Sequence, residues 1–356
     1  MKILHSADWH LDSPMVGRTA EQAQALSRAQ LALPGRIAGL CREEGCDLML
    51  LSGDLFDGEY SRESLDAVRQ ALREAAVPVF ISPGNHDFCG PASPYLTETW
   101  PENVHIFTHE QMEAVVLPEL SCRVYGAGYR SMDCGALLRD FHAEGEERFC
   151  VGVLHGDPVQ SSSAYCPVTA EQVRQSGLAY LALGHIHKNG SFRAGAALCA
   201  WPGCPMGRGF DELGEKGVLI VTLEDTARER FVPLETPRFY DWELEAGENA
   251  ADSLRAALPA VGSGDFYRVA FTGESAPLDL ERLRAAFPEY PNLELRDRTV
   301  PPAQPWKALD EDSLEGAYFR LLRDAMEGRD EKTRTQIELA ARISRQLLDG
   351  QEVKLP

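Results

Sequence analysis

Positive charge, long apolar runs and closely paired cysteines are all scarce in this sequence of 356 residues. Lysine and arginine total 35 against 55 aspartates and glutamates, which gives a formal net charge of −20. Non-specific affinity for nucleic acid comes mainly from cationic side chains, so this charge argues against an extended DNA-binding surface on the chain itself. No apolar stretch reaches the roughly 18 residues of a membrane-spanning helix, so we expect no contact with a membrane.

The cysteines are nine, an odd number, and they contain no C-x-x-C pair. Scattered thiols of this kind are typical of a reducing compartment rather than of a disulfide framework. The first residues do not resemble a signal peptide, because Ile3 and Leu4 give way at once to His5, Ser6 and Asp8. We therefore expect a cytoplasmic protein.

Five short polar motifs stand out, and each follows an apolar run that is typical of a buried strand. The apolar runs cover residues 2–7, 48–52, 77–82, 150–154 and 180–183. The motifs are Asp8-Trp9-His10, Gly53-Asp54-Leu55-Phe56-Asp57, Gly84-Asn85-His86-Asp87, Leu154-His155-Gly156 and Gly184-His185-Ile186-His187. One motif alone fits an ordinary turn, but polar residues at the ends of several strands gather at one edge of a sheet. The set therefore predicts a shared metal site.

The spacing within the motifs supports this interpretation. Asp8 and His10 are two residues apart, so on an extended strand end their side chains share one face, and His185 and His187 have the same spacing. A carboxylate has two oxygens and can bridge two cations, and Asp54 is the candidate bridge. Two cations roughly 3.5–4 Å apart can bind phosphate oxygens and generate hydroxide from water.

The remaining motif residues complete the chemistry. Asn85 offers a neutral carbonyl oxygen and His155 a further imidazole, while Pro83 and Gly84 favour a sharp turn that directs Asn85 and His86 into the same cleft. Carboxylate, amide and imidazole ligands without thiolate suit manganese, iron or zinc better than calcium. We expect two divalent ions, with Mn²⁺ as the favoured metal.

With these motifs in this order, the chain resembles the calcineurin-like metallophosphoesterase superfamily. The resemblance implies an α/β fold, a four-layer αββα sandwich. It implies that the first metal is held by Asp8, His10, Asp54 and His187, and the second by Asp54, Asn85, His155 and His185. It also implies that His86 is the catalytic histidine, which donates to the phosphate or the leaving oxygen, and that Asp87 orients it.

Within the superfamily, the chain more closely resembles the SbcD-type DNA repair exonucleases, especially their YhaO-like branch. The similarity is carried by residues 1–14, 201–208 and 211–217, and it is specific over about residues 1–235. It implies cleavage of DNA from 3′ ends and within single strands, and a partner that is an SbcC-like coiled-coil ATPase; a homodimer stays open. Archaeal and eukaryotic relatives usually carry histidine at the position of Asp57, so the role of Asp57 stays open, as does that of Arg208.

Three alternatives remain. A protein phosphatase would typically carry Arg-Gly after Asp57, where this chain has Gly58-Glu59, and would end the third motif in Glu rather than Asp87. A phosphodiesterase for small molecules or cyclic nucleotides would have the same metal site. A non-catalytic assembly subunit is disfavoured by the intact ligand set.

The net charge fits a DNA enzyme only if acidic residues lie away from the cleft, if a partner supplies affinity for DNA, or if Arg130, Lys188 and Arg208 form a basic rim.

The chain divides into three predicted parts. Residues 1–236 form the nuclease domain, with helices expected over residues 20–43 and 62–76 and a loop over residues 88–100. Residues 237–303 form a small α/β cap of β-α-β-α-β order, which we expect to position DNA. The Pro-rich stretch of residues 300–305 separates it from a helical segment, residues 304–356.

Two amphipathic helices are expected in that last segment, over residues 311–326 and 332–348, with a short break at residues 328–330. The first carries Leu314, Tyr318, Leu321, Leu322 and Ala325 on one face, and the second Ile337, Ala340, Ile343 and Leu347. These faces either pack on each other or on the first domain, or they dock the ATPase.

Overall fold

The computed structural model describes residues 1–247, 249–259, 264–300 and 304–350. The chain divides into two compact units. The first contains Met1–Tyr240 with a short segment that ends at Phe266, and the second contains the rest of the chain. The predicted boundary after residue 303 lies outside the described residues, so the division into three domains stays a prediction.

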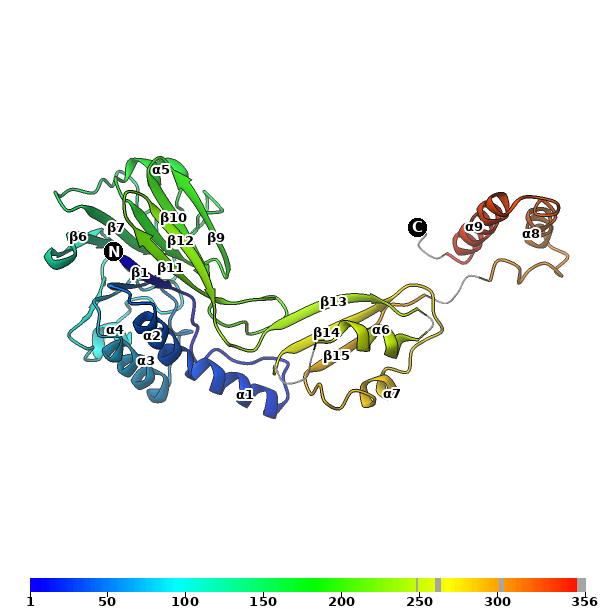
Figure 1. Ribbon diagram of the computed structural model, residues 1–356, viewed down its shortest axis with the longest axis horizontal. Helices are drawn as coiled ribbons and strands as arrows, with labels where there is room; N and C mark the ends of the chain where they lie inside the picture. Colours follow the sequence, from blue (N-terminus) through cyan, green and yellow to red (C-terminus); the bar gives the residue numbers. More distant parts are fainter. Residues whose placement is uncertain (248, 260–263, 301–303, 351–356) are drawn as a thin grey trace. The chain divides into compact units, whose positions relative to one another are not determined.

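Two six-stranded sheets form the first unit (Figure 1). The order of the first is β12 (Ala227–Pro233), β11 (Gly217–Leu223), β1 (Lys2–Ser6), β2 (Leu48–Leu51), β3 (Val79–Ile81), β4 (Val104–Ile106). The order of the second is β5 (Glu113–Leu117), β6 (Cys122–Gly126), β7 (Phe149–His155), β8 (Tyr180–Gly184), β10 (Ala197–Gly203), β9 (Lys188–Ala194). The five apolar runs therefore form β1, β2, β3, β7 and β8, as the sequence predicts.

Alternating side chains divide the core into layers, because successive residues of a strand point to opposite faces. In β2, Leu48 and Leu50 pack between the two sheets with residues such as Val151 and Val153 of β7. Their neighbours Met49 and Leu51 pack in a different cluster, under the helices.

Helices cover the outer face of each sheet (Figure 1). The first sheet is covered by α1 (Ala20–Leu31), α2 (Leu33–Glu43) and α3 (Arg62–Ala75), and the second by α5 (Ala170–Gln175). The short α4 (Pro94–Thr97) and a 3₁₀ turn at Pro118–Leu120 lie in connecting loops. This arrangement of helix, sheet, sheet and helix confirms the predicted four-layer sandwich.

The helical stretch expected over residues 20–43 is two helices rather than one. The chain breaks at Ala32, which ends α1 and begins α2, and Pro34 lies in the first turn of α2. Proline has no N–H and its ring clashes with the carbonyl four residues earlier, so it is tolerated in a first turn but not inside a helix. The predicted loop at residues 88–100 likewise contains a single helical turn, α4.

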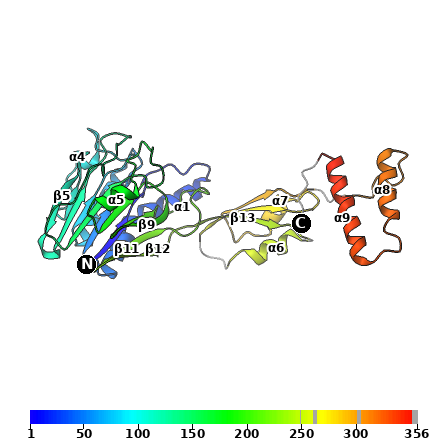
Figure 2. The same cartoon turned by 90° about the horizontal axis from the view of Figure 1, so that it is seen from above.

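The second unit contains most of a small three-stranded sheet with its two helices, followed by a further pair of helices. Its order is β13 (Phe239–Glu245), α6 (Ala250–Ala257), β14 (Phe266–Thr272), α7 (Leu280–Ala285) and β15 (Leu293–Asp297), and the sheet order is β13-β14-β15. This is the predicted β-α-β-α-β sequence of elements. The helices α8 (Leu314–Asp324) and α9 (Glu331–Leu348) lie side by side in both views (Figures 1 and 2).

The helix pair has a small core of its own. Ala308, Phe319 and Ala341 are its buried hydrophobic residues, with Trp306 and Leu322 packed against them. Most of the predicted apolar face of α8 is not part of this core: Leu314 is 90% exposed and Leu321 is 69% exposed.

Among the described residues, no helix has the length and apolar character needed to cross a membrane.

Candidate metal centre

The five motifs meet in one place, where β1, β2, β3, β7 and β8 end. Backbone hydrogen bonds connect the first two loops: the Asp8 N–H donates to the Gly53 carbonyl at 3.0 Å, and the His10 N–H donates to the Asp54 carbonyl at 2.9 Å. Asp8, His10, Asp54 and His185 all have positive φ, between 46° and 90°. Left-handed backbone costs a residue other than glycine about 1–3 kcal/mol and persists where the surrounding structure enforces it, often at functional sites.

Two glycines permit the close approach of these loops. A Cβ on Gly84 would lie 2.3 Å from Asp54 Oδ1 and 2.8 Å from the His155 ring, and a Cβ on Gly184 would lie 2.0 Å from the Ser52 carbonyl oxygen. No side chain fits at such distances. The glycines of the third and fifth motifs therefore allow the polar side chains to converge.

One cluster forms around His10 and His187, whose Nε2 atoms are 3.1 Å apart. The other ring nitrogens are held by carboxylates: His10 Nδ1 is 2.9 Å from Asp57 Oδ1, and His187 Nδ1 is 2.6 Å from Glu212 Oε1. A carboxylate accepts a hydrogen bond from the Nδ1–H, which leaves the Nε2 lone pairs facing each other. Carboxylate oxygens of Asp8 and Asp54 lie near these nitrogens. Two lone pairs that face each other suit a cation between them.

A second cluster forms around His155. Its Nδ1 is 2.9 Å from the Ser52 carbonyl and donates to it, so Nε2 carries the lone pair. That Nε2 lies 2.9 Å from Asn85 Oδ1 and 3.4 Å from Asp54 Oδ2. The His185 ring packs edge-on against the His155 ring, with centroids 5.3 Å apart. Asp54 therefore takes part in both clusters, as a bridging ligand must.

The buried carboxylates fit a pair of divalent cations. Asp8 Oδ2 is buried and has no hydrogen-bond partner among the residues that the structure describes. Burial, together with the neighbouring Asp87, raises the pKa of Asp54 to about 7, and burial also raises the pKa of Asp8. A buried carboxylate stays charged only where a cation or hydrogen-bond donors stabilise it. Oxygen and imidazole ligands in this arrangement supply a site for such cations.

His86 stands at the open side of the centre, with 43% of its side chain exposed. Its Nδ1 lies 2.8 Å from Asp57 Oδ1, and its backbone N–H donates to Asp54 Oδ1 at 2.9 Å. The hydrogen bond to Asp57 is the main cause that raises the pKa of His86. The same Asp57 oxygen also holds His10, so one carboxylate joins a candidate ligand to the candidate proton donor. Asp57 therefore contacts the imidazole rings of both His10 and His86.

The expected contact between Asp87 and His86 is wrong, because Asp57 makes it instead. The buried Asp87 carboxylate accepts the backbone N–H groups of Leu55 and Gly84, both at 2.7 Å, and the Tyr95 hydroxyl at 2.6 Å. Asp87 therefore links the loops of the second and third motifs through hydrogen bonds. The family resemblance implied a pairing that the turn geometry does not produce.

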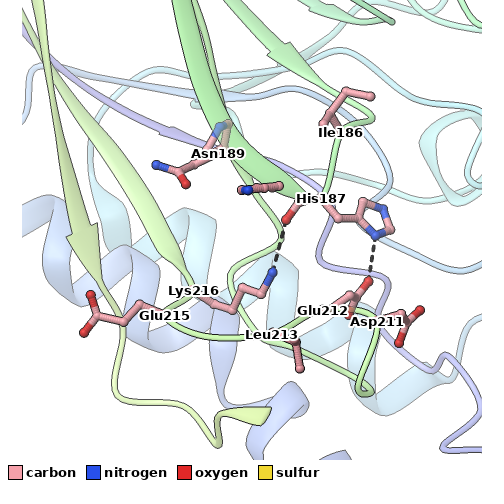
Figure 3. A pocket seen from close by; sticks show the side chains of 10 residues that line it. Ile186, His187, Asn189, Asp211, Glu212, Leu213, Glu215 and Lys216 are labelled. Carbon is pink, nitrogen blue, oxygen red and sulfur yellow. Dashed lines mark hydrogen bonds and ion pairs between the residues drawn. The ribbon is translucent and has the colours of Figure 1, made fainter. Parts of the chain in front are cut away.

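Two residues beyond the motifs belong to the centre. Glu212 holds His187, and Arg208 binds Glu212 through its backbone N–H and its Nη2, both at 2.8 Å. Figure 3 shows the first of these contacts in a pocket lined also by Lys188 and Lys216. Both residues lie in the stretches that carried the sequence similarity, yet nothing in their spacing indicated that they reach His187. Of the predicted basic rim, Lys188 and Arg130 are exposed and Arg208 is partly buried.

Comparison with known proteins agrees with the geometry. The chain is 31% identical over 239 residues to the uncharacterized metallophosphoesterase YhaO of Bacillus subtilis, covering 62% of this chain and 57% of YhaO. It is 22% identical over 326 residues to the D chain of the nuclease SbcCD from Staphylococcus epidermidis, covering 81% and 83%. It is 25% identical over 270 residues to the protein of the same name from Bacillus subtilis, covering 62% and 66%. The chain thus spans less than two thirds of the length of YhaO. The model of the calcineurin-like phosphoesterase family matches residues 1–189, which hold all five motifs, and the chain belongs to this family.

Proposed function

We propose that the chain is a metal-dependent DNA nuclease of the SbcD type, which degrades duplex ends from the 3′ side and cuts single strands internally. The observation that carries this proposal is the convergence of two ligand clusters on Asp54, with the half-exposed His86 beside them. Hydrolysis of a phosphodiester needs both features, because the charge on its oxygens must be neutralised and the leaving oxygen must receive a proton.

In this proposal Asp8, His10, Asp54 and His187 hold the first ion, and Asp54, Asn85, His155 and His185 hold the second. When bound, the two ions neutralise the negative charge of the phosphate and lower the pKa of a water molecule. The mixed carboxylate, amide and imidazole donors favour Mn²⁺ over Mg²⁺, because Mg²⁺ binds mainly through oxygen and water.

The side chains supply the acid chemistry. Asp57 accepts a hydrogen bond from His86 Nδ1, which fixes the ring and keeps the imidazole protonated to higher pH than usual. His86 can then donate from Nε2 to a phosphate oxygen or to the leaving oxygen. Ser52 and Glu212 orient the neighbouring rings through His155 Nδ1 and His187 Nδ1, so that their Nε2 atoms stay available as ligands.

Two relatives named as parts of the nuclease SbcCD support DNA as the substrate, and one of them matches 81% of this chain. The net charge of −20 opposes it, and two divalent ions change that sum only to −16. Arg208 and Lys188 provide cationic groups next to His187. We assign most of the DNA affinity to a partner.

The proposed partner is an SbcC-like coiled-coil ATPase that docks on the C-terminal helices. Leu314 and Leu321 of α8 are seven residues apart, which places them on one helical face, and both are exposed. Leu347 of α9 is 63% exposed. Apolar side chains presented by paired helices fit recognition by another amphipathic helix. Two relatives are named as one subunit of a larger nuclease, which supports an assembly of this kind.

A second candidate is a phosphoesterase for a small phosphodiester or a phosphoprotein, and the acidic charge favours it over DNA. Purified full-length protein loaded with Mn²⁺ should be assayed side by side on duplex DNA, single-stranded DNA, cyclic nucleotides and a phosphoprotein. We expect turnover of both DNA substrates. Turnover of cyclic nucleotide or phosphoprotein without DNA cleavage would establish the second candidate instead. No turnover of any substrate by the metal-loaded protein would indicate a non-catalytic assembly subunit.

A further inference from the structure

The segment of residues 204–216, which connects β10 to β11, binds both the backbone carbonyl and the imidazole ring of His187. Lys216 Nζ donates to the His187 carbonyl oxygen at 3.3 Å, and the Cys204 backbone N–H donates to the same oxygen at 3.3 Å. The Glu212 carboxylate forms a hydrogen bond with the His187 imidazole (Figure 3). This segment lies outside the residues that the family model matches. The backbone and the ring of one candidate ligand are thus fixed by residues that come later in the chain.

Glu212 is placed for a directional hydrogen bond to His187. Its side chain is 5% exposed, and its Oε1 lies 2.6 Å from His187 Nδ1. The carboxylate is kept in place by Arg208, whose Nε and backbone N–H reach Oε2 at 3.3 and 2.8 Å, while Nη2 reaches Oε1 at 2.8 Å. Both oxygens are therefore occupied by donors, which leaves Glu212 to orient His187 rather than to bind an ion itself.

The consequence for the imidazole is a choice of tautomer. A neutral histidine has one N–H and one lone pair, and a carboxylate at Nδ1 selects the form with the proton on Nδ1. The lone pair then sits on Nε2, which points at His10 Nε2 from 3.1 Å. Without Glu212, the proton can move to Nε2 and the ring can rotate, and either change removes the lone pair from the cluster.

We infer that Glu212 is a positioning residue that sets the affinity of the first metal site by fixing the tautomer and orientation of His187. The inference rests on the proposed metal centre. The inference adds to the proposed centre a role in metal affinity for Glu212, a residue of the segment 204–216 that lies outside all five motifs.

The test is Mn²⁺ binding by the metal-stripped full-length protein, measured by calorimetric titration in wild type and in Glu212→Gln. The amide keeps the shape of the carboxylate but loses the charge that holds the Nδ1 proton. We expect the variant to bind one ion at one site about 10–100-fold more weakly than wild type, the usual cost of losing such a partner. The second site should keep its affinity, because Ser52 rather than Glu212 holds His155.

A matched control separates positioning from the general loss of an ion pair. Glu147 makes a similar two-pronged contact with Arg123, at 2.9 and 3.0 Å, and its side chain is 16% exposed. Glu147→Gln should lower stability slightly, because a partly buried ion pair is lost, while both Mn²⁺ affinities stay at the wild-type value. In addition, ¹⁵N spectra of the metal-free proteins, recorded at a pH where His187 is neutral, should show its Nδ1–H form in wild type and in Glu147→Gln, but a mixture of tautomers in Glu212→Gln.

If Glu212→Gln does not fold, Glu212→Asp tests the same point. It keeps a negative charge for Arg208 but draws the carboxylate back from His187 by about 1.5 Å, one carbon–carbon bond, so the same affinity should fall. Wild-type affinity at both sites in a folded Glu212 variant overturns this inference and leaves the proposed function intact. A wild-type protein that binds no divalent ion overturns both.

Discussion

In the candidate metal centre, side chains from distant strands contact one another, whereas the C-terminal helices α8 and α9 make few such contacts. His155 Nδ1 binds a carbonyl 103 residues away, and His10 Nε2 lies 3.1 Å from a nitrogen 177 residues away. The core of the helix pair consists of Ala308, Phe319 and Ala341, with a few half-buried neighbours, and it leaves Leu314 and Leu321 in solvent. The first region is shaped around polar atoms that converge, and the second presents apolar atoms outward.

This difference indicates two kinds of dependence. Strained backbone and buried carboxylates in the first region are costs that only bound cations or a well-aligned hydrogen-bond network offset. Exposed leucines in the second region cost little in the isolated chain and gain stabilisation only when something covers them. Substitutions in the first region should therefore change chemistry, and substitutions in the second should change association.

The largest effect on the rate of cleavage is expected for Asp54→Ala. Asp54 lies near both His10 Nε2 and His155 Nε2, so its loss should empty both proposed sites and lower the rate by more than about 10⁴-fold, beyond the contribution of one general acid. Metal content measured by elemental analysis, together with single-turnover rates, checks this. Asp47→Asn is the control, since Asp47 accepts the Lys2 backbone N–H far from the motifs. Full metal content in Asp54→Ala would contradict the bridging role.

His86→Ala should come next, with a rate loss of about 10²–10⁴-fold and metal content near that of wild type. The reason is that His86 is half-exposed and its Nδ1 faces Asp57, so it is placed to donate a proton rather than to bind an ion. His109→Ala, which changes an exposed histidine paired with Glu113, should leave both measurements unchanged. Metal loss equal to that of Asp54→Ala would assign His86 to the ligands instead.

The third prediction contrasts Asp57→Asn with Asp87→Asn. Asp57 holds His86 and His10, so its amide variant should lose about 10–100-fold in rate, with little change in melting temperature. Asp87 accepts backbone N–H groups and the Tyr95 hydroxyl, so its amide variant leaves buried donors unpaired and should cost about 1–3 kcal/mol of stability. Kinetics and thermal unfolding of both variants check this. The opposite pattern would restore Asp87 as the partner of His86.

The smallest effect on catalysis is expected for the double substitution Leu321→Glu and Leu347→Glu. Both side chains are more than half exposed, so the helices should stay folded and Mn²⁺-dependent cleavage of short DNA should match wild type. Binding to a coiled-coil ATPase should be lost, because two charges would be buried in an apolar contact. Phe319→Ala is the contrasting variant: it removes a fully buried side chain of the helix pair and should unfold it. Unchanged binding of the ATPase by the double variant would place its docking surface elsewhere.

Several features followed from the sequence because they depend on neighbours along the chain. Apolar runs of strand length indicated β1, β2, β3, β7 and β8, and the polar residues after them were expected at one edge of a sheet. The break between α1 and α2 is also readable from Pro34, whose chemistry is local, although only a helical stretch over residues 20–43 was expected there. The acidic charge and the odd number of cysteines likewise follow from composition alone.

Other features depended on which loops meet in space, and no local pattern encodes that. The choice of Asp57 over Asp87 as the partner of His86 is set by the direction of two turns, and the contact of Glu212 with His187 crosses 25 residues. The exposure of Leu314 and Leu321 depends on how α8 and α9 pack, because helical periodicity shows that a face is apolar but not what covers it. The sequence by itself determined the types of the candidate ligands and the strands that carry them, and the tertiary structure decided which atoms of those residues face one another.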